Sequence, residues 1–422
     1  MNRPTVTLCM IVKDETHIIE QCLRSMAKYI DRYDITDTGS TDGTQDLIKK
    51  IMEELNIPGE VHQSDWKGFG DHGGKMGSRT ESLQTAKKFG ADYAWVIDAD
   101  DYIQGDFKYP DNMTADAYAI SMGRAEFGWW RNQIFNLEHD WKYIGVLHEY
   151  ADCASKPREE LSFDKIRGNY RVIARTEGAR NVGINPIDKY KRDAKTLEDA
   201  LVDEPKNERY HFYLAQSYFD SQQWEKSLEA YQKRVAFGGW PEEVYYSLLR
   251  CGILKGMLEK PIEEVTQAFL ECYNSRPIRA EPLWFLSRLY RMNEKPAVAY
   301  LYARMAAEIP FPEHDILFIQ NDVYSWCVLD EIAATAFYAG FPEVGLQACK
   351  KLLGTHNLIP VEHRERVLNN MKSYEEVLQK IQESKSKMDI PVEKKTDVGT
   401  KEKKSTKMPS KKGYKARKKQ KV

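Results

Sequence analysis

The 422-residue sequence lacks several features that define common protein classes. It has no run of 18 or more apolar residues, so no transmembrane helix is predicted. Its seven cysteines are scattered without Cys-x-x-Cys spacing, which indicates neither a zinc site of paired cysteines nor a disulfide framework. The first residues enter a strand-like run without a secretory signal. These absences predict a soluble, cytoplasmic protein with reduced thiols.

Two glycine-rich phosphate-binding motifs are not found where a nucleotide-binding sheet would need them. There is no Gly-x-x-x-x-Gly-Lys-Ser/Thr, and no Gly-x-Gly-x-x-Gly follows the first predicted strand at residues 5–12. Kinase and dehydrogenase functions are therefore excluded. A nucleotidyltransferase is disfavoured because the loop at residues 13–17 contains no glycine. A nucleotide site made of carboxylates and a metal ion is the arrangement that these absences leave open.

Negative charge is scarce at the end of the chain. Residues 401–422 contain 11 Lys and Arg against one acid, Glu402, although the whole chain has a net charge of -2. Such a polybasic segment is typical of a solvated, disordered tail. Because Tyr414 is its only aromatic residue, specific nucleic-acid binding is not predicted.

The most informative motif is an apolar strand at residues 93–103 that ends in three carboxylates, Asp98, Asp100 and Asp101. Carboxylate oxygens at a sheet edge are suitable ligands for Mg²⁺ or Mn²⁺ carrying a diphosphate. A strand followed by an acidic turn would show the same pattern. The motif therefore needs its neighbours in the sequence to be interpreted.

Those neighbours alternate between strand and helix. A continuously apolar run at 5–12 and a short strand at 33–36 are each followed by apolar residues at helical spacing. A glycine-containing segment at 37–44 can turn tightly and begin the second helix. Polar residues thus follow successive strands. This order predicts an open α/β sheet that binds its ligand along the carboxyl edge.

Several motifs resemble the ordered signatures of family 2 glycosyltransferases with the GT-A fold. They are Met-Ile-Val-Lys-Asp-Glu at 10–15, Asp-Thr-Gly-Ser-Thr-Asp-Gly-Thr at 37–44 and Asp-Ala-Asp-Asp at 98–101, with further similar elements at 69–70, 77–80, 130–135 and 145–149. The resemblance covers about the first 185 residues. It implies an α/β fold class, with an open mixed sheet of GT-A type and helices on both faces.

The resemblance also implies site residues. Nucleotide binding is expected for Lys13, Asp14, Glu15, Asp37, Arg79 and Asp98. A cation, Mn²⁺ or Mg²⁺, would be bound by Asp98, Asp100 and His148. The general base would be Glu149, with Asp140 in reserve. Alternatives stay open, since Arg79 could form a surface ion pair and His148 could be a packing residue.

Helical periodicity follows from residue 186. Leu214-Ala215-x-x-Tyr218 begins a pattern of large and small residues that recurs at Leu248, 34 residues after Leu214, as in tetratricopeptide (TPR) repeats. Core packing is the default interpretation of the aromatic residues in these repeats. The predicted domains are a GT-A domain at 1–185, a TPR-like helical domain at 186–382 and a lysine-rich tail at 383–422.

The function implied is a metal-dependent, inverting glycosyltransferase of hexosyl or N-acetylhexosaminyl type. Its donor would be a nucleoside diphosphate sugar such as a UDP-sugar, and its acceptor the hydroxyl of a glycan, peptide or protein. The repeats of similar enzymes bind a protein acceptor or form a homodimer. The alternative is a non-catalytic TPR interaction protein with a degenerate nucleotide-binding domain.

Overall fold

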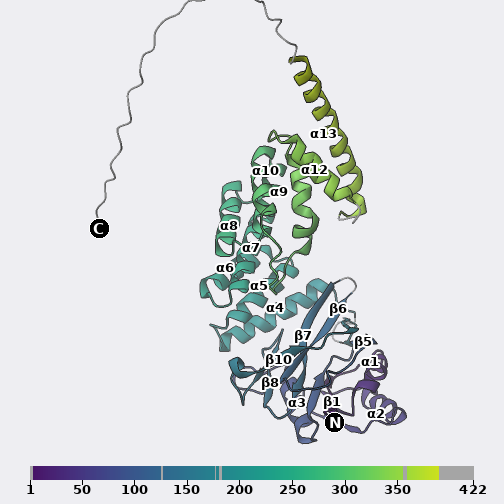
Figure 1. Cartoon of the computed structure of the whole chain (residues 1–422). Helices are drawn as coiled ribbons and strands as arrows, with labels where there is room; N and C mark the ends of the chain where they lie inside the picture. Colours follow the sequence, from purple (N-terminus) through teal and green to yellow (C-terminus); the bar gives the residue numbers. More distant parts are fainter. Residues whose placement is uncertain (1–2, 125–126, 176, 180–182, 355–358, 389–422) are drawn as a thin grey trace, which may run out of the picture.

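The computed structural model describes residues 3–124, 127–175, 177–179, 183–354 and 359–388 (Figure 1). A mixed α/β region comes first and a helical region follows it, extending away from the sheet with α13 at its far end. The coarse prediction of a large sheet followed by helical repeats is therefore confirmed. The predicted tail lies outside the described residues from 389 onward.

The sheet region is built around one nine-stranded sheet of order β3-β2-β1-β4-β7-β6-β11-β5, with β10 beside β6. Its strands are β1 (Val6–Val12), β2 (Arg32–Asp37), β3 (Gly59–Gln63), β4 (Tyr93–Val96), β5 (Tyr102–Asp106), β6 (Ala117–Arg124), β7 (Phe127–Asn136), β10 (Phe163–Lys165) and β11 (Asn169–Ile173). The first four strands are parallel, whereas β7 is antiparallel to both β4 and β6. Strands β1 and β4 are apolar runs because helices cover both of their faces.

Helices pack on both faces of this sheet. On one face, α1 (Ile19–Met26) and α2 (Thr44–Glu54) belong to a core cluster that includes Trp95. On the other, α3 (Ser78–Lys88) contributes Leu83 and Ala86 to a second cluster. A two-stranded sheet of β8 (Trp141–Ile144) and β9 (Tyr150–Cys153) packs against α3. Short helical turns lie at η1 (Ala27–Tyr29) and η2 (Arg158–Glu160).

The helical region starts at α4, where the side chain of Asn185 accepts a hydrogen bond from the amide of Ile187 and caps the first turn. Each helix packs on the next in sequence, as helix pairs do in repeat proteins. The helices are α4 (Pro186–Asp203), α5 (Glu208–Asp220), α6 (Trp224–Phe237), α7 (Pro241–Met257), α8 (Ile262–Ser275), α9 (Glu281–Met292), α10 (Pro296–Ala307), the π-helix η4 (Val323–Cys327), α11 (Val328–Thr335), α12 (Pro342–Leu353) and α13 (Val361–Met388).

The last helix continues past the predicted end of the helical domain at 382. Apolar spacing fades there, but Glu, Lys and Gln are good helix formers and allow α13 to reach Met388. The division into domains at 185 and 382 stays a prediction. Among the described residues, no helix is long and apolar enough to cross a membrane.

The sheet region and the helical region share a packed junction. Leu147, just before β9, lies in one buried cluster with Leu197 of α4 and Leu214 of α5. The Arg209 guanidinium donates a 2.8 Å hydrogen bond to the carbonyl of His148. The two regions therefore meet through both apolar and polar contacts, side by side in Figure 1.

The connection between α10 and η4, residues 308–322, turns back across the repeats, and we refer to it as the return segment. The amides of Ile316 and Leu317 both donate to the carboxylate of Glu242, at 2.8 and 2.7 Å. Asp315 in the same segment is fully buried and accepts a 3.1 Å hydrogen bond from Arg279. The return segment is thereby attached to the start of α7 and to the turn before α9.

Candidate functional site

The predicted nucleotide residues lie where β1 and β2 end. Asp37 is buried, and its Oδ1 accepts hydrogen bonds from the amides of Gly39 and Ser40 at 3.0 and 2.9 Å. Asp14 accepts a 2.8 Å bond from the amide of Thr41. Lys13 is exposed. Two of the predicted carboxylates thus hold the 37–44 loop in place.

A chain segment after β11 closes over two further acids. The amide of Ala179 donates to both carboxylate oxygens of Glu15, and the amides of Glu177 and Gly178 donate to Asp100 Oδ2 at 3.1 and 3.0 Å. Burial raises the pKa of Glu15 and of Asp100. Backbone donors therefore occupy both carboxylate oxygens of Glu15 and one oxygen of Asp100, all of which were predicted to face a ligand.

The neighbouring Asp101 is 3% exposed. Burial, and after it the charges of Asp98 and Asp100, raises its pKa to about 8. Asp101 accepts a 3.2 Å hydrogen bond from the amide of Arg175. At neutral pH its carboxyl group is therefore mainly protonated, and it supports the turn as a neutral side chain.

Arg79, Asp98 and Glu149 form one ion-paired group. Arg79 Nη2 lies 2.6 Å from Asp98 Oδ1, and Arg79 Nε lies 2.7 Å from Glu149 Oε1 without hydrogen-bond alignment. Arg131 approaches the other oxygen of Asp98 at 3.7 Å. Burial alone would raise the pKa of Asp98, but Arg79 and Arg131 outweigh it and lower this pKa. The structure therefore brings three predicted residues together as a neutralised cluster.

The helix α3 is placed for this contact by a close backbone approach. A Cβ on Gly77 would lie 2.4 Å from the backbone of Gly70, so only glycine fits at this position. The amide of Arg79 then donates to the carbonyl of Phe69 at 3.0 Å. The start of α3 is thereby fixed beside the end of β4.

The remaining predicted residues lie apart from this cluster. The ring of His148 stacks on Tyr213 of α5, with centroids 3.9 Å apart and planes at 9°. Asp140 pairs with Lys87 at 2.5 Å, near the end of α3. Since Lys87 lies eight residues after Arg79, this pair is about 12 Å along the helix axis from Arg79. Asp140 and Glu149 are therefore not in one place.

The predicted metal site is not assembled. In the part of the chain that the structure describes, no group of three or more His, Cys, Asp or Glu side chains could hold a metal ion. Both oxygens of Asp98 face arginines, and Asp100 Oδ2 accepts hydrogen bonds from two backbone amides, so this donor set as arranged does not fit a divalent cation. The characterisation as a metal-binding, manganese-dependent protein is therefore wrong. The expectation of a Mn²⁺ or Mg²⁺ cofactor stays a prediction.

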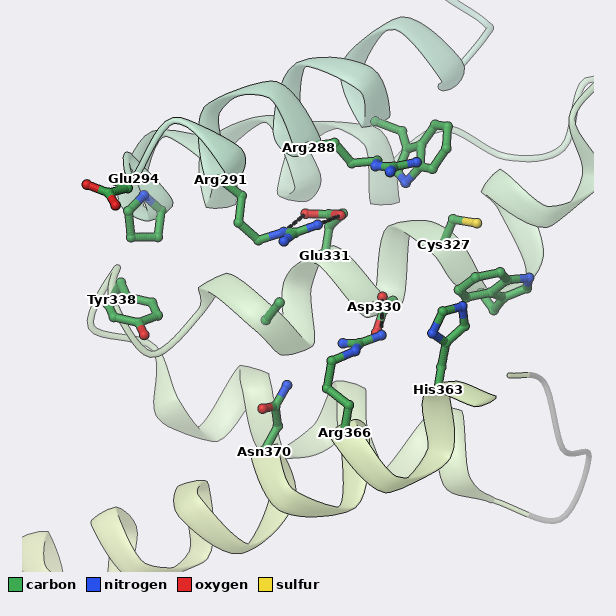
Figure 2. Close-up of a pocket in the computed structure, with 14 residues that line it drawn as sticks. Arg288, Arg291, Glu294, Cys327, Asp330, Glu331, Tyr338, His363, Arg366 and Asn370 are labelled. Carbon is green, nitrogen blue, oxygen red and sulfur yellow. Dashed lines mark hydrogen bonds and ion pairs between the residues drawn. The ribbon is translucent and has the colours of Figure 1, made fainter. Parts of the chain in front are cut away.

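A second candidate site lies in the helical region. A pocket of about 700 Å³ opens between α9, α11 and α13 (Figure 2). This volume is within the range of ligand pockets, roughly 300–1,000 Å³. The residues that line it are Trp284, Arg288, Arg291, Glu294, Pro296, Trp326, Cys327, Asp330, Glu331, Ala334, Tyr338, His363, Arg366 and Asn370.

Two ion pairs build the walls of this pocket. Arg291 of α9 binds the buried Glu331 of α11 with two hydrogen bonds, at 2.8 and 2.9 Å. Arg366 of α13 donates a 2.9 Å bond to Asp330 of α11. Figure 2 shows both pairs reaching across from neighbouring helices. A bidentate pair fixes the relative position of two helices, so the pocket is held open by its own polar contacts.

This pocket was not predicted from the sequence. The aromatic residues of the repeats were expected to pack in the core, whereas Trp284 and Trp326 line an open cavity. The available signal was the spacing of Trp284, Arg288 and Arg291, which places one aromatic and two basic residues on one face of a helix.

Comparison with known proteins gives one curated relative that extends over both regions. The "TPR repeat-containing protein Synpcc7942_0270" of Synechococcus elongatus is 24% identical over 325 residues, covering 71% of this chain and 74% of the relative. That share is larger than the helical region and the tail together, so it includes part of the sheet region. No model of a known protein family matches this chain.

Two solved structures with partial similarity are those of MamA and of YrrB. "Crystal structure of MamA" is 15% identical, with a TM-score of 0.31, and covers 41% of this chain and 95% of that one. The structure of YrrB, "a TPR protein with an unusual peptide-binding site", is 12% identical, with a TM-score of 0.32, and covers 44% of this chain and 85% of that one.

These findings correct the predicted function. The interpretation as a glycosyltransferase, and with it the assignment of an enzyme, is wrong, because the relative that matches most of this chain is named for its TPR repeats. A nucleotide-sugar partner likewise has no support. The TPR-like part of the resemblance is supported, and it agrees with the described helices.

Proposed function

We propose that this protein is a non-catalytic interaction protein whose TPR-like repeats bind a segment of a partner protein. The observation that carries the proposal is the pocket between α9, α11 and α13, which is large enough for several side chains and is lined by tryptophans and arginines. Aromatic residues and Arg are the side chains most enriched at protein interfaces. The TPR-named relative supports the same function.

The sheet region then serves as a scaffold for the repeats. We propose that its topology is of GT-A type. The parallel order β3-β2-β1-β4 followed by antiparallel strands supports this proposal. The assignment of Lys13, Glu15 and their neighbours to nucleotide binding stays a prediction, as do a homodimer through the repeats and the domain boundaries. A cytoplasmic location draws support from the seven cysteines, all buried and unpaired.

The test uses a variant that fills the pocket. Ala334 lines the cavity on α11, and Ala334→Phe would occupy part of its volume. The parent and the variant would each be used for affinity purification with quantitative mass spectrometry, and every protein enriched with the parent would be purified and titrated against both by calorimetry. Circular dichroism would check that both are folded.

We expect at least one purified protein to bind the parent and to bind Ala334→Phe at least tenfold more weakly, a difference of about 1.4 kcal/mol. If binding by every purified protein is the same for the parent and the variant, the pocket is not the binding site and the proposal is wrong.

A further inference from the structure

Resting on the proposed function, we infer that the pocket between α9, α11 and α13 selects an acidic, extended segment of the partner protein. The first reason is that one arginine of the pocket has no carboxylate partner, so its positive charge is local. The lining as a whole has three arginines and three acids, one of them the exposed Glu294. Arg288 is exposed, and its guanidinium lies over the ring of Trp284 at 5.0 Å. In the described part of the chain, no carboxylate forms an ion pair with Arg288.

The second reason is the number of hydrogen-bond donors in the pocket. A guanidinium has five N–H donors, and Arg366 uses its Nη2 for Asp330 while its side chain is 44% exposed. Arg288 and Arg366 together therefore offer more donors than the protein satisfies. A carboxylate accepts such donors in a bidentate way, so an Asp or Glu side chain of a partner is the group that fits.

The third reason is a side chain that can pair with a peptide backbone. Asn370 on α13 lines the same cavity, and its amide can both donate and accept. An extended peptide presents backbone N–H and C=O groups in alternation, which supplies both kinds of partner for Asn370.

The aromatic residues complete this description of the ligand. Trp326 packs beside His363 with ring centroids 5.4 Å apart, and Tyr338 is 63% exposed at the mouth. These rings offer apolar area next to the arginines. The expected segment therefore combines acidic side chains with neighbouring apolar or aromatic ones. A basic segment would face Arg288 and Arg366 directly, and is disfavoured.

The experiment titrates the full chain with a positional-scanning library of nonapeptides blocked at both ends, followed by calorimetry with the best peptide at low and high salt. The variants are Arg288→Gln, Ala334→Phe and a control, Arg304→Gln. Arg304 on α10 is also exposed, at 46%, and pairs with Glu308 outside the pocket. The control removes one positive charge, as Arg288→Gln does.

We expect pools with a fixed Asp or Glu to bind most tightly, and Arg288→Gln to weaken the best acidic peptide roughly tenfold, the loss typical of a hydrogen-bonded charge pair. Arg304→Gln should bind like the parent, and high salt should weaken the acidic peptide. If neutral or basic pools bind as tightly as acidic ones, and Ala334→Phe abolishes this, the charge inference is wrong and the proposed function stands. If no pool distinguishes the parent from Ala334→Phe, the proposed function is wrong as well.

Discussion

The buried arginine that anchors the return segment provides the sharpest stability prediction. The side chains of Arg279, Glu281 and Asp315 are all fully buried. Arg279 lies 2.6 Å from Glu281 and 3.1 Å from Asp315. The substitution Arg279→Met keeps most of the side-chain volume but removes the charge, so it leaves two carboxylates without their shared cation.

The expected loss is about 3 kcal/mol of unfolding free energy. Removing one partner of a buried ion pair costs about 3–5 kcal/mol. The lower end applies because Glu281 keeps hydrogen bonds from the hydroxyls of Tyr324 and Tyr245, at 2.7 and 3.1 Å, and Asp315 keeps its pair with Arg276. These donors compensate part of the negative charge that Arg279 leaves behind.

The measurement is urea denaturation followed by tryptophan fluorescence, combined with hydrogen exchange of α7 to α11, which reports local unfolding. The control is Arg304→Met, because Arg304 belongs to an exposed pair that should change stability by less than about 0.5 kcal/mol. A loss below about 1 kcal/mol for Arg279→Met, or a loss equal to that of the control, would refute this reasoning.

Three further predictions concern packing and pH. In Gly345→Ala the new Cβ would lie 2.2 Å from Tyr374. Overpacking costs about 1–3 kcal/mol, which exceeds the roughly 1 kcal/mol gain in helix propensity, so the melting temperature should fall. A higher melting temperature would contradict this. Burial would raise the pKa of Asp116, but hydrogen bonds from Lys156 and its neighbours outweigh this and lower it. Its stabilisation is therefore fully present above pH ~4 and is lost as pH falls through the folded pKa. Asp116→Asn should melt lower than the parent at pH 7, and the difference in melting temperature should shrink steadily as the pH falls below ~4. The pKa of Asp101 is raised to about 8, so the cost of ionising this buried carboxyl group in the folded state grows as pH rises from ~4 to ~8. Asp101→Asn should therefore be more stable than the parent by at least ~1 kcal/mol at pH 8.5 and equal to it at pH 4. The same stability difference at both pH values would exclude titration as the cause.

Three strands of the parallel part of the sheet, β1, β2 and β4, were accessible from sequence because they depend on local pattern, whereas the edge strand β3 was not predicted. The apolar runs that form β1 and β4, and the polar residues after them, are visible without knowledge of neighbours. The antiparallel part was not, since β5 pairs with β11, a strand more than 60 residues later. Pairing of that kind is decided by side-chain packing across the whole sheet.

The two candidate sites also depend on contacts between residues that are far apart in the sequence. The motif at 98–101 predicted oxygen ligands, but the groups that occupy them come from distant positions, with Arg79 19 residues before Asp98 and Gly178 78 residues after Asp100. The pocket is assembled from three helices, and its pair of Arg291 and Glu331 spans 40 residues. A carboxylate motif therefore predicts a ligand only where no other residue of the same chain already pairs with the carboxylates.

The return segment changes how the repeats can unfold. In a repeat protein each unit contacts only its neighbours, and the array can open one unit at a time from an end. Here residues 308–322 follow α10 yet are hydrogen-bonded to Glu242 at the start of α7. Opening α7 and α8 therefore breaks contacts with a segment beyond α10. We expect the helices from α7 to α11 to open together, so that their slowest amides exchange hydrogen at similar rates.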